Sequence, residues 1–450
     1  MENSANARET AIMILDKVLS EKAYSNLALK HGLENSSLSR VDKALVTEIV
    51  NGTLKNLIKL DYIVSQFVKT NVSKLDKHVE DILRTGIYQI MYLDRIPDSA
   101  VCNEGSNLAR KYSNEGAVKF VNGVLRNVSR NKESIQFPDK VKEPLRYLSV
   151  VYSHPLWIVE KWLGEFSFEF TEQLLIANNK VPNFTIRVNR LKTDRESLMK
   201  ILDQEGIEYG EGLYNKDALY IKGTSAIEGK SSFRQGLYQI QDESSMLVGR
   251  VLDPKPGDLV IDVCSAPGGK STHAAELMEN KGRIIARDVY QHKLDLIQQN
   301  CKRLGITIVE TEIFDGKELD RKLVGKVDKV LLDAPCSGLG VLRRKPDMKL
   351  KKTPDNFDEL NKLQQQMLSK AAEYVKPRGV LVYSTCTINK SENIKVVEAF
   401  LRNREDFYLE DLSELLPENL ESNTKTKGYV EIFPNIHGID GFFIARLRRK

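Results

Sequence analysis

Residues 257–288 read GDLVIDVCSAPGGKSTHAAELMENKGRIIARD, and this stretch sets the architecture of the largest part of the chain. An apolar run is followed by a turn with two glycines, a helical stretch and a second apolar run. The alternation continues, and the predicted strands are 259–263, 283–286, 306–310, 327–332 and 379–383. Short Val, Ile and Leu runs separated by helices are typical of parallel strands buried on both faces. We therefore predict a doubly wound, Rossmann-like α/β sheet, in which ligands bind at the carboxyl ends of the strands.

The turn after the first predicted strand, residues 264–270, is suited to a ligand bound through the backbone. Gly268 and Gly269 allow close backbone approach, and the N-terminus of the helix that follows favours negative charge. A Walker A loop would need a glycine where Cys264 stands, and a dinucleotide fingerprint would need three spaced glycines, so ATP, GTP and NAD are disfavoured. S-adenosylmethionine (SAM) remains, because its carboxylate and sulfonium need close backbone approach without a pyrophosphate cradle.

Two acidic residues stand where further ligand contacts are expected. Asp288 follows Gly269 by 19 residues, near the ~20-residue spacing at which an acidic side chain meets ribose hydroxyls. Asp315 follows the third predicted strand, where it faces either the adenine edge of the ligand or, as an exposed turn residue, only solvent. Both interpretations of Asp315 stay open at this point.

The fourth and fifth predicted strands run into two cysteine turns, Asp333-Ala-Pro-Cys336 and Thr385-Cys386. These strands are neighbours in this topology at a spacing of ~4.8 Å, so Asp333, Cys336 and Cys386 are expected to converge beside the ligand. Carbon 5 of cytosine is too poor a nucleophile to attack a methyl sulfonium, but addition of a thiolate at carbon 6 activates it. Asp333 is predicted to hydrogen-bond the N3 and N4 edge of the ring. The cysteine pair therefore favours methylation of cytosine carbon 5 over methylation of oxygen or exocyclic nitrogen.

The residues before 131 read as helices, because apolar residues recur at spacings of three and four. The apolar faces at 79–91 and 117–128 are expected to bury each other in an all-α bundle. After a connector, apolar and polar residues alternate at 184–188, which predicts a small α+β module. The predicted domains are an all-α bundle at 1–135, a linker and small α+β module at 136–240, and the α/β domain at 241–450.

The composition is that of a globular protein with a mild basic excess, 67 Lys and Arg against 62 Asp and Glu, or a net charge of +5. This balance permits nucleic-acid binding without demanding it. The five cysteines include no Cys-x-x-Cys pair, so they are predicted to be free thiols, without a disulfide framework or a metal site. A polar start and the lack of an apolar run of about 18 residues predict a cytoplasmic protein without a membrane span or a secretory signal.

Five stretches together resemble the signature set of the RNA cytosine-5 methyltransferases of the NOL/NOP/Sun group: DVCSAPGGKS, LLDAPCSGLG, YSTCT, YQIQDESS and GIDGFFIARL. The helical first third, with NGVLRN, resembles the RNA-binding protein NusB. The combined resemblance covers nearly the whole chain. It implies a NusB-like RNA-binding bundle and a SAM-dependent methyltransferase domain that modifies a cytosine of 16S rRNA, at the family's 967 site. A monomer is expected.

The resemblance also implies roles for individual residues. Cys386 would be the attacking nucleophile, and Cys336 would assist product release. The implied SAM contacts are Cys264, Ser265, Ala266, Pro267, Gly268, Gly269, Lys270, Asp288, Asp315 and Asp333. One departure from the expected pattern is Arg287, which stands immediately before Asp288 where a small or apolar residue is expected.

Three basic segments are candidates for contact with an RNA phosphate backbone. The first is residues 110–130, where only Glu115 is acidic and the cations are Arg110, Lys111, Lys119, Arg126 and Arg130. The alternative for this segment is an ordinary solvated helix face. The other two are LRRKPDMKLKK at 342–352, directly after the Cys336 turn, and the terminal RLRRK at 446–450. The alternative functions are methylation of a tRNA or another rRNA site, and a noncatalytic RNA-binding factor of the NusB type.

Overall fold

The structure is a computed structural model that describes residues 6–34, 36–69, 75–223, 227–354 and 356–450. The chain forms two compact units. The first comprises Met1–Lys180 and Leu342–Lys352, and the second comprises Val181–Val341 and Thr353–Lys450. The short segment after the Cys336 turn therefore belongs to the first unit. The domain boundaries at 135 and 240 stay predictions.

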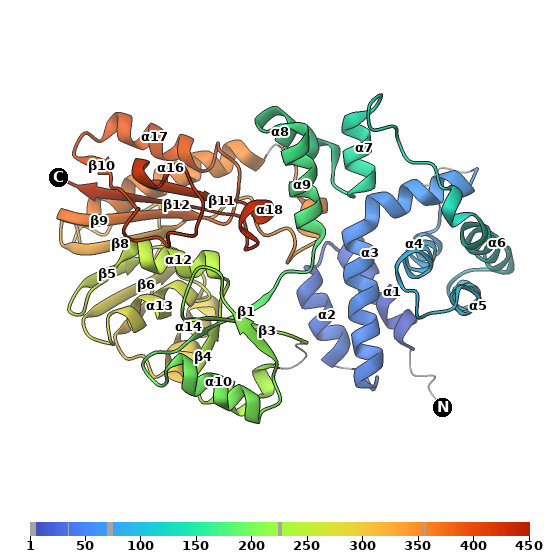
Figure 1. Cartoon of the computed structure of the whole chain (residues 1–450), viewed down its shortest axis with the longest axis horizontal. Coiled ribbons are helices and arrows are strands. Elements are labelled where there is room, and N and C mark those ends of the chain that lie inside the picture. Colours follow the sequence, from blue (N-terminus) through green and yellow to red (C-terminus); the bar gives the residue numbers. More distant parts are fainter. Residues whose placement is uncertain (1–5, 35, 70–74, 224–226, 355) are drawn as a thin grey trace. The chain divides into compact units, whose positions relative to one another are not determined.

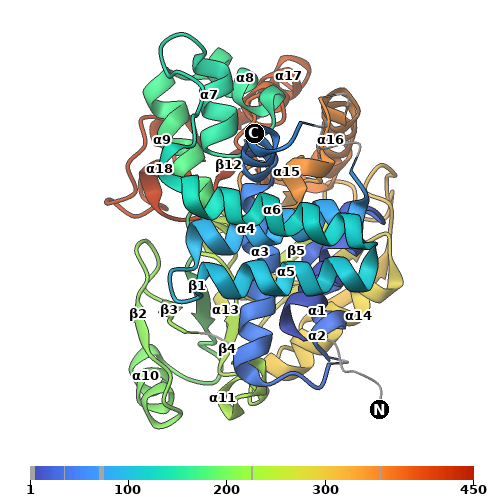
Figure 2. The ribbon, with the colours of Figure 1, turned by 90° about the vertical axis from the view of Figure 1, so that its right-hand side faces the viewer.

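The first unit is built from helices. They are α1 (Ala7–Leu19), α2 (Ser25–Glu34), α3 (Arg40–Phe67), α4 (Lys77–Tyr92), α5 (Asp98–Tyr112), α6 (Glu115–Asn131), the 3-10 turn η2 (Lys132–Ser134), α7 (Pro144–Val151), α8 (Leu156–Glu165), α9 (Phe168–Asn179) and α15 (Met348–Lys351). Helices α4, α5 and α6 lie side by side (Figure 2) and bury the two apolar faces that the sequence predicts. A Cβ at Gly86 in α4 or Gly105 in α5 would lie 2.7 Å from a methyl carbon of Leu125 in α6, so a larger residue at either position would force that side chain to move. The predicted all-α bundle is confirmed.

The second unit begins with a small antiparallel sheet whose strand order is β2-β3-β1-β4. Its elements are β1 (Phe184–Val188), α10 (Arg195–Gln204), β2 (Tyr209–Glu211), β3 (Ala218–Ile221), η3 (Ile227–Gly229), α11 (Ser231–Arg234) and β4 (Tyr238–Ile240). Ile186 and Val188 of β1 pack against Leu198 and Leu202 of α10 in its core. The predicted small α+β module is confirmed.

The rest of the second unit is an eight-stranded mixed sheet (Figure 1). Its strands are β5 (Leu259–Asp262), β6 (Arg283–Asp288), β7 (Val309–Ile313), β8 (Val327–Asp333), β9 (Val375–Thr385), β10 (Phe407–Leu409), β11 (Tyr429–Ile432) and β12 (Phe442–Arg449). The order is β10-β12-β9-β8-β5-β6-β7, with β11 paired to β12. The strands β9, β8, β5, β6 and β7 run parallel to one another, which confirms the predicted doubly wound fold.

Two details of the predicted sheet are wrong. The third strand begins at Val309, because Ile306 instead packs in the loop beside α14. The antiparallel strands β10, β11 and β12 were not expected, since GIDGFFIARL was interpreted only as a motif. In the structure, Phe442 to Leu447 of that motif are buried, and β12 extends the sheet beside β9.

Helices cover both faces of the large sheet, and its core has two halves. One face carries α12 (Glu243–Leu252), α13 (Gly269–Leu277) and α14 (Gln291–Leu304). The other carries α16 (Asn356–Tyr374) and α17 (Ile394–Asn403), and the short η4 (Lys425–Lys427) and α18 (Pro434–His437) flank β11. None of the helices in the described parts of the chain is long and apolar enough to span a bilayer.

Candidate active site

The two cysteine turns leave the sheet at the same edge. Strands β8 and β9 are parallel neighbours, and Asp333 at the end of β8 is in register with Ser384 of β9. The Sγ atoms of Cys336 and Cys386 are 3.3 Å apart, and both residues are partly exposed. The backbone N–H of Gly340 donates to the carbonyl oxygen of Cys386 (3.0 Å), which ties the two turns together. The structure thus brings the two predicted thiols into contact where a ligand can reach them.

The Cys336 thiol is held in its protonated form. Its hydrogen bond with Cys386 raises the pKa of Cys336 well above the ordinary value, and burial acts in the same direction. The negative charges of Glu392 and Asp333 add to the shift. Because Cys336 keeps its proton at neutral pH, it can act as a proton donor beside the second sulfur.

Two hydrogen bonds hold the side chain of Asp333 in place beside the thiols. Its Oδ2 accepts a hydrogen bond from Nζ of Lys270 (2.7 Å), and its Oδ1 accepts one from the Ser384 hydroxyl (2.7 Å). Burial disfavours the charged form of Lys270, but Asp333 outweighs it and raises the pKa of Lys270 above the ordinary value. The Lys270 ammonium also lies 5.2 Å from the centroid of the Phe442 ring. Lys270, expected only as part of the SAM turn, therefore also belongs to the group around the thiols.

The predicted SAM turn, residues 264–270, joins β5 to α13. Gly268 has φ 96° and precedes the first residue of α13, a left-handed conformation that favours glycine. Two atoms beside the turn are buried without a hydrogen-bond partner among the described residues, namely Oδ1 of Asp262 and Nε2 of Gln241. Burial raises the pKa of Asp262 to about 7. Buried polar atoms usually have partners, so these two fit a polar ligand such as SAM at the turn.

Sequence reasoning missed a residue that holds the predicted SAM turn in place. Arg187 of β1 is 1% exposed, and its guanidinium donates to the carbonyl oxygen of Gly269 (3.0 Å) and to Glu276 of α13 (2.7 Å). It also bonds Oε1 of Gln241. Arg187 therefore fixes the start of α13 to the small sheet. No signal in the sequence marks it, because an arginine in an alternating strand is normally assigned to the solvent face.

Asp288 and Asp315 lie at the ends of the strands that were expected to carry them. Asp288 is 8% exposed and pairs with Lys293 (3.3 Å). The side chain of Asp315 is 40% exposed; it accepts a hydrogen bond from the backbone N–H of Lys317 and pairs with the Lys317 ammonium. Asp288 is thus a buried carboxylate at a strand end, and Asp315 has the contacts of a turn residue.

The departure at Arg287 has a structural explanation. Successive side chains of a strand point to opposite faces, so Arg287 turns away from Asp288. Its guanidinium pairs with Glu312 and Asp320 at 2.8 Å and lies 4.1 Å from the centroid of the Phe314 ring. Arg287 is therefore a neutralised core residue on the opposite face, and it does not take the place of Asp288 at the strand end.

The remaining cysteines are poor candidates for chemistry. Burial raises the pKa of the Cys264 thiol far above its ordinary value, so Cys264 is not a thiolate. Cys102 and Cys301 are buried free thiols, and burial raises the pKa of Cys301 to about 11. The described residues contain no group of three or more His, Cys, Asp or Glu placed to hold a metal ion.

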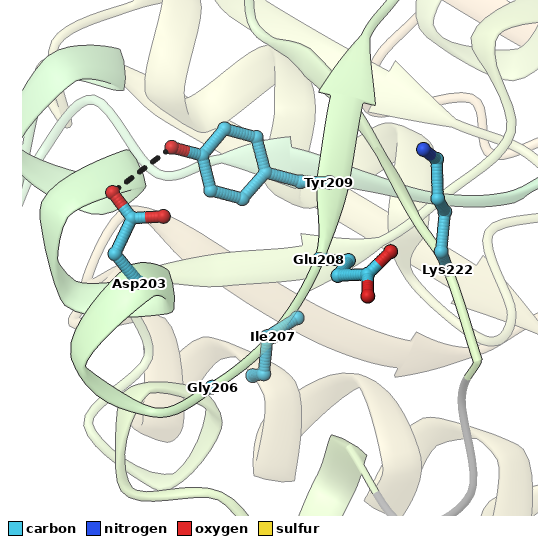
Figure 3. A pocket seen from close by; sticks show the side chains of 6 residues that line it. All are labelled: Asp203, Gly206, Ile207, Glu208, Tyr209 and Lys222. Carbon is cyan, nitrogen blue, oxygen red and sulfur yellow. Dashed lines mark hydrogen bonds between the residues drawn. The ribbon is translucent and has the colours of Figure 1, made fainter.

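A separate pocket lies on the small sheet of the second unit (Figure 3). It is lined by Asp203, Gly206, Ile207, Glu208, Tyr209 and Lys222. The Tyr209 hydroxyl donates to Asp203 (3.2 Å). The charged residues that line the pocket are of both signs. None of the predicted site residues lines this pocket, so it is not part of the candidate active site.

Several cations that were predicted to contact RNA form hydrogen bonds or ion pairs with other groups of the protein. In 342–352, Lys349 is 2% exposed, and its ammonium donates to backbone carbonyl oxygens of the helical unit. Lys351 pairs with Asp347 (2.7 Å). In the terminal segment, Arg446 and Arg448 share Glu410, and Arg449 pairs with Asp406. Lys349 and Arg446 are buried, so the prediction of phosphate contact is wrong for these two side chains. For the partly exposed Lys351, Arg448 and Arg449 it stays a prediction.

Three family models match the chain. They are 16S rRNA methyltransferase RsmB/F over residues 249–448, the NusB family over 5–130, and the ferredoxin-like domain of the RsmF/B-like methyltransferases over 154–228. The probable ribosomal RNA small subunit methyltransferase B of Bacillus subtilis is 41% identical over 448 residues, which cover 99% of each chain. The chain belongs to the ribosomal RNA small subunit methyltransferase B family.

Other members of the small subunit methyltransferase B family match over the same length. The proteins from Synechocystis sp. and Serratia proteamaculans are 35% and 31% identical, with 99% of both chains covered. The crystal structure of PH0851 covers 100% of both chains with a TM-score of 0.83 and 28% identity. The structure of NSun6 from Pyrococcus horikoshii with SFG, a SAM analogue, covers 66% of this chain and 98% of its own, with a TM-score of 0.58 and 26% identity.

Proposed function

We propose that this protein transfers a methyl group from SAM to carbon 5 of a cytosine in 16S rRNA, at the family's 967 site, through a covalent cysteine adduct. The observation that carries the proposal is the pair of partly exposed thiols, 3.3 Å apart, beside the Asp333 carboxylate. Transfer to oxygen or to an exocyclic nitrogen would require no thiol. The curated relatives are named for ribosomal RNA of the small subunit, which supports the choice of RNA. A ribosomal RNA substrate implies that the protein acts in the cytoplasm.

Cys386 is proposed as the nucleophile and Cys336 as the group that assists release. The Cys386 thiol gives its proton to solvent water, its sulfur bonds to carbon 6 of the cytosine, and the electron pair of the carbon 5–carbon 6 double bond moves to carbon 5. SAM, when bound, supplies an electrophilic methyl group at this point. A base then takes the carbon 5 proton, the double bond reforms, and the bond from carbon 6 to Cys386 breaks. Cys336, a protonated thiol in contact with Cys386, is placed to hand a proton to the departing sulfur.

Asp333 is proposed to bind the polar edge of the cytosine. A carboxylate accepts from the N4 amino group, and it stabilises the N3 proton that the ring needs as charge develops in the adduct. Lys270 and Ser384 hold the two carboxylate oxygens in place. This arrangement orients the carboxylate before the base arrives, which reduces the reorganisation required during the reaction.

The residues proposed to hold SAM are those of the 264–270 turn together with Asp288, Asp315 and Asp333. The glycines would admit the methionine part close to the backbone, and Asp288 would accept from the ribose hydroxyls. Binding of S-adenosylhomocysteine, measured by calorimetry, tests this assignment. A protein that only assembles with RNA would release no heat with this ligand.

Two substitutions test the cysteine roles. Cys386→Ala is expected to abolish methyl transfer to 16S rRNA while S-adenosylhomocysteine still binds. Cys336→Ala is expected to leave a covalent protein–RNA adduct that survives on a denaturing gel. Cys301→Ala, at a buried thiol of α14, is the matched control and should behave as the wild type. An adduct trapped by Cys386→Ala would reverse the two roles, and full turnover in that variant would reject the mechanism.

The target site is tested on the RNA itself. Bisulfite sequencing of ribosomal RNA from a deletion strain is expected to show the loss of one 5-methylcytosine from 16S rRNA. Loss of a mark from a tRNA, or from another rRNA position, would reassign the substrate without changing the chemistry.

A further inference from the structure

Two consecutive buried residues, Glu392 and Asn393, contact both cysteine turns. They lie between β9 and α17, and they are 0% and 1% exposed. Neither was singled out by the sequence motifs. A buried carboxylate is costly unless its oxygens receive hydrogen bonds, so the donors that face Glu392 show what it holds.

Glu392 holds the turn that carries Cys336. The backbone N–H of Ser337, the residue after Cys336, donates to both Oε1 and Oε2 of Glu392 at 3.1 Å. A hydrogen bond to a charged acceptor is stronger than one between neutral groups. Glu392 thus fixes the backbone one residue beyond the Cys336 sulfur.

Asn393 holds the turn that carries Cys386. Its Oδ1 accepts from the Thr385 hydroxyl (2.6 Å), and its Nδ2 donates to the carbonyl oxygen of Thr387 (2.9 Å). These two residues flank Cys386 in the sequence. One amide therefore spans the turn and sets where the backbone of Cys386 lies.

The two turns are also bonded to each other through two of their side chains. The hydroxyl oxygens of Ser337 and Thr387 are 2.8 Å apart and share a hydrogen bond, and both residues are buried. The Tyr383 hydroxyl, from β9, donates to the carbonyl oxygen of Glu392 (2.6 Å). The loop that carries Glu392 and Asn393 is thereby fixed to the strand that carries Cys386.

We propose that Glu392 and Asn393 are positioning residues that lock the two cysteine turns to each other and set the separation of the sulfur atoms for the covalent reaction. The proposal rests on the proposed function. Neither residue contacts the substrate in this proposal; each acts through the backbone beside a cysteine. Adduct formation at Cys386 and release assisted by Cys336 need both sulfurs at one base, so loosening either turn slows turnover without removing a reacting group.

The test separates turnover from binding. Glu392→Ala is expected to lower kcat about 100-fold, the size of effect that a misplacement of about 1 Å produces, while KM for RNA and the Kd for S-adenosylhomocysteine stay near wild type. Glu392→Gln is expected to recover most of kcat, because the amide oxygen can still accept from Ser337. Glu398→Gln, at an exposed position of α17, is the matched control and should be neutral. A Gln variant as slow as the Ala variant, or an Ala variant with wild-type kcat, would overturn the proposal.

Two further variants keep the test decisive if Glu392→Ala does not fold. Asn393→Asp retains the acceptor for Thr385 but loses the donor to Thr387, and Thr387→Val keeps the volume but removes the hydroxyl that meets Ser337. Both are expected to lower kcat and to leave S-adenosylhomocysteine binding intact. Wild-type kcat in both variants would reject the positioning role of Glu392 and Asn393. Cys386→Ala in the same assay distinguishes failure of the proposed function from failure of the positioning role. If it is active, the proposed function fails, and if it is inactive beside fully active lock variants, only the positioning role fails.

Discussion

Two basic segments of the helical unit have similar compositions but differ in whether some of their cations are buried. The cations along α5 and α6 are exposed: Arg110, Lys111, Lys119, Arg126 and Arg130. In Leu342–Lys352, by contrast, Arg343 is 7% exposed and Lys349 is 2% exposed. The Lys349 ammonium donates to the carbonyl oxygens of Lys55 in α3 and Ser153 after α7. A run of positive residues can therefore be either a surface for phosphates or an anchor within the fold, and composition does not distinguish them.

The segment Leu342–Lys352 also follows directly after the turn that carries Cys336. Leu342–Lys352 packs with the helical unit, yet it begins two residues after Gly340, whose N–H bonds Cys386. Asp347 accepts from the Ser25 hydroxyl (2.5 Å) and from Lys351 (2.7 Å). Substitutions of the buried residues of this segment should therefore act mainly on stability, and substitutions along α5 and α6 should act mainly on RNA binding.

The largest effect is expected for Lys349→Ala. The substitution removes the Nζ group that donates to two carbonyl oxygens, and it leaves a cavity. Together these should lower the free energy of unfolding by roughly 2–4 kcal/mol. Chemical denaturation of the full chain measures it. Lys119→Ala on the exposed face of α6 is the control, with a change within about 0.5 kcal/mol. An equally small change for Lys349→Ala would erase the distinction between the segments.

A smaller, pH-dependent effect is expected for Asp347→Asn. Burial raises the pKa of Asp347, but hydrogen bonds from Lys351 and Ser25 outweigh it, and the net pKa is below the ordinary 3.8. The carboxylate therefore stabilises the fold above that pH, and the contribution is lost as the pH falls through the lowered value. At pH 7 the variant should lose about 1–3 kcal/mol, and the difference from wild type should shrink in acid. A difference that does not depend on pH would show that the charge is not involved.

The exposed segment is tested by Lys119→Ala together with Arg126→Ala. For every phosphate that a removed cation neutralises, the slope of log affinity against log salt should fall by about 0.7–0.9, while the free energy of unfolding changes by less than about 0.5 kcal/mol per site. RNA binding measured at several salt concentrations gives the slope. An unchanged slope would assign α5 and α6 to an ordinary solvated surface.

The smallest effect is expected for Lys345→Ala. Lys345 is exposed although it belongs to the same segment as Lys349. Its removal should leave stability unchanged and lower the salt slope by no more than the ~0.7–0.9 that a single neutralised phosphate contributes. A large loss of stability here would mean that the whole segment, and not only its buried lysine, anchors the fold.

Much of the fold was predictable from local patterns. The strands that end at Asp333 and Thr385 were visible as apolar runs, and their adjacency in a doubly wound sheet predicted that Cys336 and Cys386 would meet. The antiparallel strand β12 was missed because a motif interpretation concealed its strand character. Arg187, Glu392 and Asn393 were missed for another reason: polar residues in a strand or loop look the same in sequence whether they face water or a buried partner.

Periodicity and motif spacing were enough to establish the α/β sheet, the helical bundle and the placement of two thiols at neighbouring strand ends, because these features depend on residues close together in the chain. Tertiary structure alone decided which charges are buried. Lys349 meets carbonyl oxygens almost 200 and 300 positions earlier in the chain, from Ser153 and Lys55, and Arg187 reaches a carboxylate 89 positions later. Burying an ionisable side chain is tolerated only where such partners converge, and that convergence exists only in the folded chain.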